Sequence, residues 1–215
     1  MSDQFGLKIL GITPGEAAEG AQELTINTTR GPIPMIFHGT SEPDRAALCI
    51  SGAIGGVVGP SNLYARLGQE LPKAGIAIAR IDYRAPNEFG ECLLDTLAGL
   101  SFLRAMRYQR VAFIGHSFGG AVAINAGTLG PLVTTVVALS SQLAGAHVVG
   151  ELAPRSLLLV HGTADAILPH QSSEAIYERA QEPKTLKLVP EADHRFTGFG
   201  DELFKTVSDW LIEKI

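Results

Sequence analysis

The sequence predicts an α/β protein with a mostly parallel β-sheet of eight strands and helices on both faces. Apolar segments of strand length recur along the chain, and segments of helical length lie between them. Most of the strand-like segments are almost continuously apolar, which is typical of parallel strands that are covered on both faces. The length of 215 residues fits a single domain of this class, spanning residues 1–215.

The first two expected strands differ from the other six. They flank the turn-prone sequence Arg30-Gly31-Pro32 and should form an antiparallel pair at an edge of the sheet. The later runs should pair in parallel. The expected strands are 23–29, 34–37, 46–51, 76–81, 111–114, 133–139, 157–160 and 186–189.

Five helices are expected between and after these strands. In 88–106 and in 201–215 the apolar residues approximate one stripe of a helix. A doubly wound sheet of this kind gathers its ligand-binding loops at the carboxyl ends of the strands. The connection 141–155 is short, so no cap domain is expected there. The expected helices are 62–74, 88–106, 118–129, 170–180 and 201–215.

The composition excludes several classes of protein. Hydrophobic residues make up 46% of the chain and charged residues 18%, which excludes disorder, collagen and coiled coil. The net charge is -5 and Lys and Arg form no run, so neither nucleic-acid binding nor binding to an anionic membrane is expected. The expected partner is a small molecule.

The cysteines and the beginning of the chain indicate the compartment. Cys49 and Cys92 lie in apolar segments and are expected to be buried free thiols. The first residues contain neither a basic n-region nor a secretory apolar stretch, so a cytoplasmic location is expected. Residues 111–150 carry no Asp, Glu, Lys or Arg, but glycines, an asparagine and a proline interrupt the apolar runs. This stretch should be a buried centre and not a membrane span.

Gly-His-Ser-Phe-Gly-Gly, residues 115–120, is the strongest local signal in the sequence. It lies directly after an expected strand and directly before an expected helix. A strand-to-helix turn this tight strains the backbone of the serine, and only small residues at Gly115 and Gly119 allow the neighbouring backbone to pass. An ordinary buried turn serine does not explain glycines on both sides. Ser117 is therefore the candidate nucleophile.

Two further side chains supply what a serine nucleophile needs. A serine hydroxyl requires a base, and the base requires a third group that fixes its tautomer. Asp165 ends the sequence HGTAD after one strand, and His194 lies in PEADHRF after the next. Taken alone, Asp165 could cap the helix near His170, and His194 could be a solvated loop residue. Their order after Ser117, each following a different parallel strand, favours a catalytic triad.

With these motifs in this order, the chain resembles the α/β-hydrolase superfamily over essentially its whole length. The resemblance implies that Ser117 is the nucleophile, Asp165 the orienting acid and His194 the general base, after the fifth, seventh and eighth strands. The size, the segment SGAIGG at 51–56 and the lack of a cap insertion resemble compact, lidless bacterial esterases of the dienelactone-hydrolase-like type. Dienelactone hydrolases proper carry cysteine at the elbow, so serine here favours ester hydrolysis.

The resemblance also implies an oxyanion hole made of two backbone N–H groups. One belongs to Phe118, directly after the nucleophile. The other lies on the loop 51–56, where we expect Ala53, with Ile54 as the neighbouring alternative. Many family members begin this loop with His-Gly, whereas this chain has Ser51 and then glycine. Because the donors are main-chain groups, this difference in side chain need not remove the hole.

Tyr83 and Arg84 follow the strand 76–81 and could reach the mouth of the site. For Arg84 there are two alternatives, a bidentate contact with a substrate carboxylate or a structural ion pair with Glu88 or Glu91. The remaining histidines are expected to be structural or surface residues: His38, His116, His147, His161 and His170.

Metal and dinucleotide sites are less favoured alternatives. His161, Asp165 and His170 are close in sequence, but their spacing matches no zinc signature. Glycines between 52 and 59, followed by Asp82, partly match a dinucleotide loop. The G-x-G-x-x-G spacing is not met, because Ile54 occupies the place of the second glycine.

The sequence therefore predicts a serine hydrolase that cleaves carboxylic esters of small or soluble substrates through an acyl-enzyme, with no metal or organic cofactor. Lactone, thioester or peptide cleavage stays open, since the same triad serves all of these reactions. A non-catalytic binding protein on the same fold and a dinucleotide-dependent oxidoreductase are the alternatives of other classes. The oligomeric state is not predicted.

Overall fold

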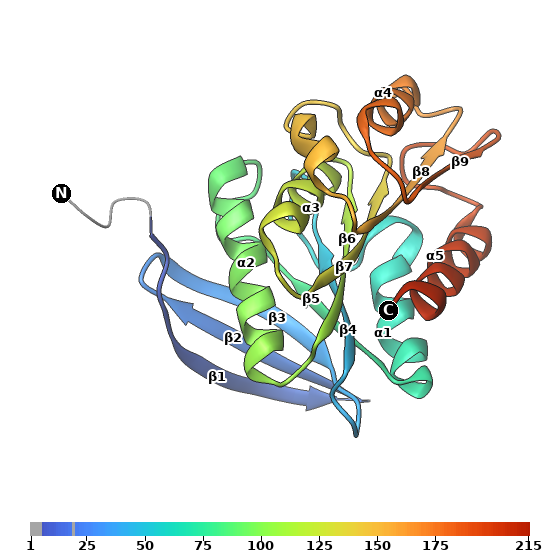
Figure 1. The fold of residues 1–215 in the computed structure, drawn as a ribbon. Coiled ribbons are helices and arrows are strands. Elements are labelled where there is room, and N and C mark those ends of the chain that lie inside the picture. The colour runs from blue at the N-terminus through green and yellow to red at the C-terminus, as the bar shows by residue number, and fades with distance from the viewer. Residues whose placement is uncertain (1–5, 19) are drawn as a thin grey trace.

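A computed structural model describes residues 6–18 and 20–215, and the strands found there form one nine-stranded sheet (Figure 1). The strand order is β1-β2-β3-β5-β4-β6-β7-β8-β9. The first five residues, which contribute to the expectation of no secretory segment, lie outside the described part. The strands are β1 (Ile9–Ala18), β2 (Ala21–Thr28), β3 (Gly31–His38), β4 (Arg45–Ile50), β5 (Ile76–Ile81), β6 (Arg110–His116), β7 (Val133–Leu139), β8 (Ser156–Gly162) and β9 (Lys184–Val189).

The sheet has a parallel part and an antiparallel extension. Strands β4 to β9 pair in parallel, whereas β1, β2 and β3 pair antiparallel with one another and β3 joins the edge of β5. The expected antiparallel pair around Arg30 and Gly31 is confirmed as β2 and β3. The expected count of eight strands is wrong by one, because β1 forms the outer edge.

β1 was missed because its sequence lacks the pattern of a buried strand. Two glycines and a proline interrupt it, and the side chains from Ile9 to Ala17 are exposed. Its pairing with β2 shifts register at two places, next to Gly11 and after Pro14. An edge strand held by one neighbour and facing solvent does not need the apolar alternation that a half-buried strand shows.

The helices form two layers on opposite faces of the sheet (Figure 1). One layer contains α1 and α5, and the other contains α2, α3 and α4. A hydrophobic core lies on each face of the sheet, and alternate residues of β4 pack into one or the other. Leu48 and Ile50 face the α2–α3 layer, and Cys49 faces the α1–α5 layer. The helices are α1 (Leu63–Glu70), α2 (Phe89–Ala105), α3 (Phe118–Leu129), α4 (Gln171–Arg179) and α5 (Gly200–Lys214).

The expected helices are confirmed, with one division. The segment 62–74 is split into α1 and a 3₁₀ turn, η2 (Leu71–Ala74), because Pro72 has no N–H to continue the α-helical hydrogen bonds. Two further 3₁₀ turns are η1 (Pro60–Asn62) and η3 (His147–Glu151). The connection between β7 and β8 carries η3 alone and no cap domain, as expected.

The strand order determines where the loops meet. The chain passes from β4 to β5 through α1 on one face, and then to β6, on the other side of β4, through α2 on the opposite face. A crevice forms at the carboxyl ends of strands where the direction of winding reverses in this way. The loops after β4 and β6 flank this point, and those after β8 and β9 lie farther along the same edge.

The expected burial of the chain's centre and of both thiols is confirmed. Residues 111–150 include β6, α3 and β7, most of whose side chains are buried. Cys49 and Cys92 are free and buried, and burial raises the pKa of each thiol to about 12. Among the helices that the structure describes, none combines the length and the hydrophobicity needed to cross a bilayer.

Candidate active site

The turn between β6 and α3 has the strain that the sequence predicts. Ser117 has φ 57° and ψ −122°, a conformation that few non-glycine residues adopt. A Cβ atom at Gly115 would lie 2.0 Å from the carbonyl oxygen of Gly119, and one at Gly119 would lie 2.1 Å from that of Ser51. Both glycines are therefore required by close backbone contacts, and Ser117 is presented at the tip of the turn.

Asp165 and His194 are brought together from separate loops. The Nδ1 atom of His194 lies 2.7 Å from Oδ2 of Asp165 and donates to it. The backbone of the two loops is also joined, since the N–H of Ala164 donates to the carbonyl of Ala192 at 3.0 Å. The expected juxtaposition of residues 29 positions apart is thus present (194 − 165 = 29).

The carboxylate of Asp165 is fully enclosed and fully hydrogen-bonded. Its side chain has 0% exposure, and Oδ1 accepts from the N–H groups of Ile167 and Leu168, each at 2.8 Å. Burial by itself favours the neutral acid, but hydrogen bonds from Leu168, the His194 ring and Ile167 outweigh it and lower the pKa of Asp165 below its usual value. The group is therefore an anion at neutral pH, beside a ring that can accept a proton.

Ser117 and His194 line one pocket of about 350 Å³. Within the described part of the chain, the hydroxyl of Ser117 makes no hydrogen bond. Because Nδ1 of His194 is bound to Asp165, Nε2 is the ring nitrogen that remains for this hydroxyl. Catalytic hydrogen bonds of this kind are often long before substrate binds, and a serine hydroxyl rotates freely.

His116 links the turn at Ser117 to the loop of His194, a role that the sequence did not indicate. Its Nε2 donates to the backbone carbonyl of His194 at 2.9 Å, and the two rings lie 4.8 Å apart. Burial lowers the pKa of His116 to about 4, so the ring is neutral at pH 7. Its position directly before Ser117 was the available signal, because the last side chain of a strand lies at the same edge as the loop that follows.

The loop after β4 lies against the turn at Ser117. A Cβ atom on Gly52 would lie 3.8 Å from Cβ of Ser117. The N–H of Gly55 donates to the carbonyl of Gly52 at 3.1 Å, and this turn leaves the N–H groups of Ala53 and Ile54 outside its own hydrogen bond. Both residues line the pocket. Phe118 is the first residue of α3, where a helix leaves its N–H groups unpaired.

Polar contacts fix this loop from its outer side. The N–H of Gly56 donates to Oδ1 of Asp82 at 2.7 Å, and the next carbonyl, of Val57, accepts from Nη1 of Arg80 at 3.2 Å. The hydroxyl of Ser51 bonds the carbonyl of Gly56 across the loop. Asp82 is thus occupied with the loop itself and is not free for a ribose hydroxyl, which argues against the dinucleotide alternative.

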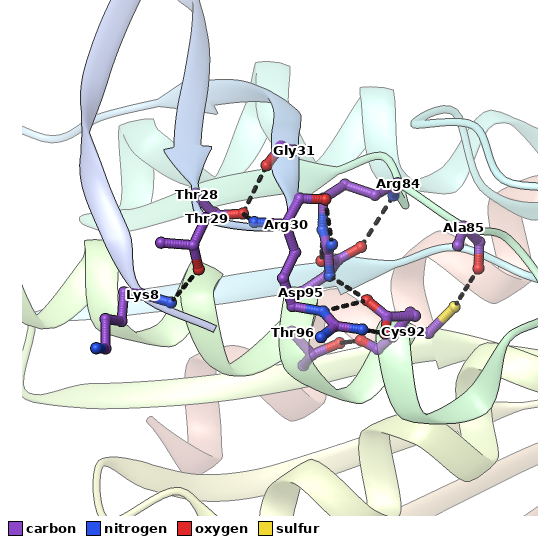
Figure 2. Close-up of polar contacts among 11 residues, drawn as sticks. Lys8, Thr28, Thr29, Arg30, Gly31, Arg84, Ala85, Cys92, Asp95 and Thr96 are labelled. Atoms are coloured by element: carbon purple, nitrogen blue, oxygen red, sulfur yellow. Dashed lines mark hydrogen bonds and ion pairs between the residues drawn. The ribbon is translucent and has the colours of Figure 1, made fainter. Parts of the chain in front are cut away.

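Arg84 forms a structural ion pair, which is the second of the two alternatives that the sequence left open. Its Nε lies 2.5 Å from Oδ1 of Asp95, its Nη2 lies 2.9 Å from Glu91, and its Nη1 donates to the carbonyl of Arg30 (Figure 2). The Asp95 side chain has 0% exposure, and burial raises the pKa of this carboxyl despite the nearby guanidinium. All three nitrogens are bonded to protein and the side chain is only 7% exposed, so Arg84 is held within the protein and does not reach a substrate.

Tyr83 is also placed behind the site and not at its mouth. It is 5% exposed, and its ring packs edge to face against Phe118 at 6.4 Å. The described residues that line the pocket include neither Tyr83 nor Arg84. Tyr83 therefore supports the start of α3, and the expectation that these two residues contact substrate is corrected.

The metal alternative has no support in the geometry. Within the described residues no cluster of His, Cys, Asp and Glu is arranged to hold a metal ion. His161 bonds Asp165, but His170 lies 3.9 Å from Glu174 on the outside of α4. The three residues that are close in sequence are therefore divided between two sites.

No family model matches the chain, but related sequences and structures do. The protein YfhR of Escherichia coli K12, which is uncharacterized, is 28% identical over 220 aligned residues, covering 87% of this chain and 76% of YfhR. A solved dienelactone hydrolase from Anabaena variabilis has a TM-score of 0.77 and 19% identity, covering 91% of this chain and 99% of that one. The structure of Est1E from Butyrivibrio proteoclasticus has a TM-score of 0.77 and 15% identity, covering 89% and 98%.

These likenesses confirm the fold expected from the sequence. The sheet order, the two helical layers and the absence of a cap domain are those of an α/β hydrolase, and the chain has that fold. At 15 to 19% identity a structural likeness does not carry over a substrate or a set of catalytic residues. The chemistry must be argued from the site.

Proposed function

We propose that the protein is a serine hydrolase that cleaves carboxylic esters through an acyl-enzyme intermediate. One observation carries the proposal: a strained serine at a β6–α3 turn and a histidine bound to a buried aspartate line the same pocket. Packing alone does not require this combination, since strain at Ser117 costs stability and Asp165 is a buried charge. The solved neighbour named as a dienelactone hydrolase is consistent with it.

The proposed reaction has two steps. In the first, Nε2 of His194 takes the proton of Ser117, whose oxygen attacks the ester carbonyl, and the same nitrogen then protonates the leaving alcohol. In the second, His194 takes a proton from water, whose oxygen attacks the acyl carbonyl, and then returns that proton to the oxygen of Ser117 as the bond between this oxygen and the acyl group breaks and the acid leaves. Asp165 stays ionised throughout, keeps the proton of neutral His194 on Nδ1 and stabilises the imidazolium.

The oxyanion formed in both steps would be bound by main-chain N–H groups. Phe118 offers one donor, and the turn at Ala53 and Ile54 offers the other, with Ala53 as the proposed residue. The contacts of Asp82 and Arg80 with the loop hold its shape before substrate arrives. Such preorganised donors need no rearrangement at the moment when charge develops, which is the source of their effect on rate.

The pocket favours a small ester with an apolar part. Its volume of about 350 Å³ lies at the lower end of the range for small-molecule sites. Three apolar side chains at its rim are strongly exposed: Ile54 at 82%, Ile167 at 67% and Val58 at 50%. Such a rim suits a short acyl or alkoxy chain, and the absence of a cap leaves long chains without cover.

A covalent probe tests the proposal directly. A fluorophosphonate should label the wild-type protein and fail to label Ser117→Ala, because only an activated serine attacks phosphorus. Ser101→Ala is the matched control, since Ser101 lies on the exposed side of α2 and its hydroxyl donates to the carbonyl of Leu97. Absence of labelling in a folded wild-type protein would favour the non-catalytic binding protein instead.

A substrate panel then tests the ester class and its size. We expect p-nitrophenyl acetate and butyrate to be hydrolysed with higher kcat/KM than the palmitate ester. A lactone and a thioester of similar size belong in the same panel, because the triad alone does not separate these reactions. Faster hydrolysis of the palmitate ester would contradict the assignment to small substrates.

A further inference from the structure

His161 is a buried histidine that the proposed mechanism does not use. It lies at the end of β8 with 0% exposure, four residues before Asp165. Its Nε2 is 3.0 Å from Oδ2 of Asp165 and 3.1 Å from the carbonyl oxygen of Leu168, and its Nδ1 is 2.7 Å from the hydroxyl of Ser173 on α4. Every polar atom of the ring therefore has a partner.

These partners fix the tautomer of His161. A carboxylate and a carbonyl can only accept hydrogen bonds, so Nε2 carries the proton. The hydroxyl of Ser173 can donate, so it gives its proton to the bare Nδ1. Burial lowers the pKa of His161, and the neutral ring required by this arrangement is the form present at neutral pH.

The oxygen to which His161 donates is the one that holds His194. Oδ2 of Asp165 accepts from Nδ1 of His194 at 2.7 Å and from Nε2 of His161 at 3.0 Å, while Oδ1 accepts two backbone N–H groups. A carboxylate with one donor fewer on Oδ2 could rotate about its Cβ–Cγ bond and turn that oxygen away from His194. Four donors in fixed positions leave it one orientation.

We propose that His161 is a positioning residue of the triad, which holds the Asp165 carboxylate in the rotation that orients His194. The inference rests on the proposed ester hydrolysis, and it assigns a role to a residue that touches no substrate. His161 acts on the reaction through Asp165 alone, because it lies behind that carboxylate and does not line the pocket.

The ionisable groups around this carboxylate come from three strand ends. His161 is the last residue but one of β8, His116 is the last residue of β6, and His194 and Arg195 follow β9. Of these, Arg195 carries a permanent positive charge and lines the pocket. The helix α4, which packs on β8, contributes the neutral Ser173 to the group. Removal of the His161 donor should therefore raise the pKa of Asp165, because among the described side chains His194 alone would still donate to Oδ2.

The first test uses the wild-type protein and does not depend on activity. Nitrogen-15 NMR of the histidine rings distinguishes the two neutral tautomers, and we expect a proton on Nε2 and none on Nδ1 of His161. A protonated Nδ1 would overturn the proposal, because Nε2 could then donate nothing to Asp165. This measurement requires no variant, so it decides the matter even if substitutions at this buried position prevent folding.

The second test compares two substitutions that differ in one donor. His161→Phe removes the donor, whereas the side-chain amide of His161→Gln can place an N–H near the former Nε2. Carbon-13 titration of the Asp165 carboxyl should show its pKa raised by about half a unit or more in His161→Phe and close to wild type in His161→Gln. An unchanged pKa of Asp165 in folded His161→Phe would overturn the proposal.

Kinetics complete the comparison. Loss of a hydrogen bond to a charged group should reduce kcat/KM for p-nitrophenyl acetate by about 10-fold in His161→Phe, and His161→Gln should recover most of it. His170→Gln, at the half-buried start of α4, is the matched control and should behave as wild type. Wild-type kcat/KM in His161→Phe would overturn the proposal. If the wild-type protein hydrolyses no ester at all, the proposed function fails, while the tautomer and the Asp165 titration still report on His161.

Discussion

Gly119→Ala should reduce ester hydrolysis strongly while leaving the protein folded. The added Cβ would lie 2.1 Å from the carbonyl oxygen of Ser51 and 2.8 Å from that of Ile50, both backbone atoms. A relaxed carbon–oxygen contact is about 3.3 Å or longer, so the start of the loop after β4 must move by about 1 Å. Oxyanion donors act within a window of roughly 2.7 to 3.1 Å, and a shift of this size removes the donor at Ala53.

The expected magnitude follows from these two effects. Loss of one oxyanion donor typically lowers kcat by about 10²- to 10³-fold. Overpacking costs about 1–3 kcal/mol, and the higher helix propensity of alanine offsets about 1 kcal/mol, so the free energy of unfolding should fall by no more than about 2 kcal/mol.

Gly90→Ala is the matched control for this prediction. Gly90 and Gly119 are each the second residue of a helix, and each follows a phenylalanine. A Cβ atom on Gly90 would meet nothing within 4 Å. Steady-state kinetics with p-nitrophenyl acetate and thermal unfolding of both variants give the comparison. A Gly119→Ala protein with kcat within about 3-fold of wild type would refute the reasoning, since the displaced loop could not then carry an oxyanion donor.

Three further predictions concern the acid, the ion pair and the buried histidines. Asp165→Asn should lower kcat by about 10³- to 10⁴-fold, because an amide can stabilise the wrong tautomer of the ring; a small effect on p-nitrophenyl acetate would contradict the triad. Arg84→Met leaves Asp95 buried and unpaired, so chemical unfolding should show a loss of about 3–5 kcal/mol, with equal changes in activity on neutral and acid-bearing esters. Burial lowers the pKa of His38 and of His116 to about 4, so the folded protein binds fewer protons than the unfolded chain between about pH 6.5 and 4. Stability should fall as the pH is lowered through that interval, and equal free energies of unfolding at pH 7 and 4.5 would contradict this assignment.

The parallel part of the fold could be predicted because burial on both faces leaves a continuous apolar signature. β4 to β9 and their helices lie within a few residues of the expected bounds. The position of Ser117 could be predicted because the close contacts of the turn at β6 demand glycines on both sides. β1 could not be predicted from the sequence, because an exposed edge strand is held by hydrogen bonds to β2 and needs no buried apolar side chains.

The roles of Arg84 and His161 depend on contacts between distant segments. Arg84 is held by Asp95, which lies on the inner face of α2 beside Cys92. A charged residue in that apolar stripe was the available signal, because a buried carboxylate requires a partner. The partner's identity follows only from the crossing of α2 over the end of β5. His161 likewise finds Ser173 on α4, a contact that the spacing of strand residues does not indicate.

The precision of the proposed site comes from backbone contact between its loops and not from the side chains at its mouth. The turn at Ser117 touches the carbonyl of Ser51, and the loops of Asp165 and His194 are joined by hydrogen bonds of Ala164 with Ala192. His116 joins the turn at Ser117 to the loop of His194, because it is the last residue of β6 and donates to the carbonyl of His194. These joined loops form the framework of the site, and a displacement of any one of them must displace another. Side chains at the rim of the pocket, such as Ile54, can be replaced without moving this framework. On this basis Ile54→Ala should alter the preference between acetate and butyrate esters without changing the titration of Asp165, and a change in that titration would show that rim and framework are coupled.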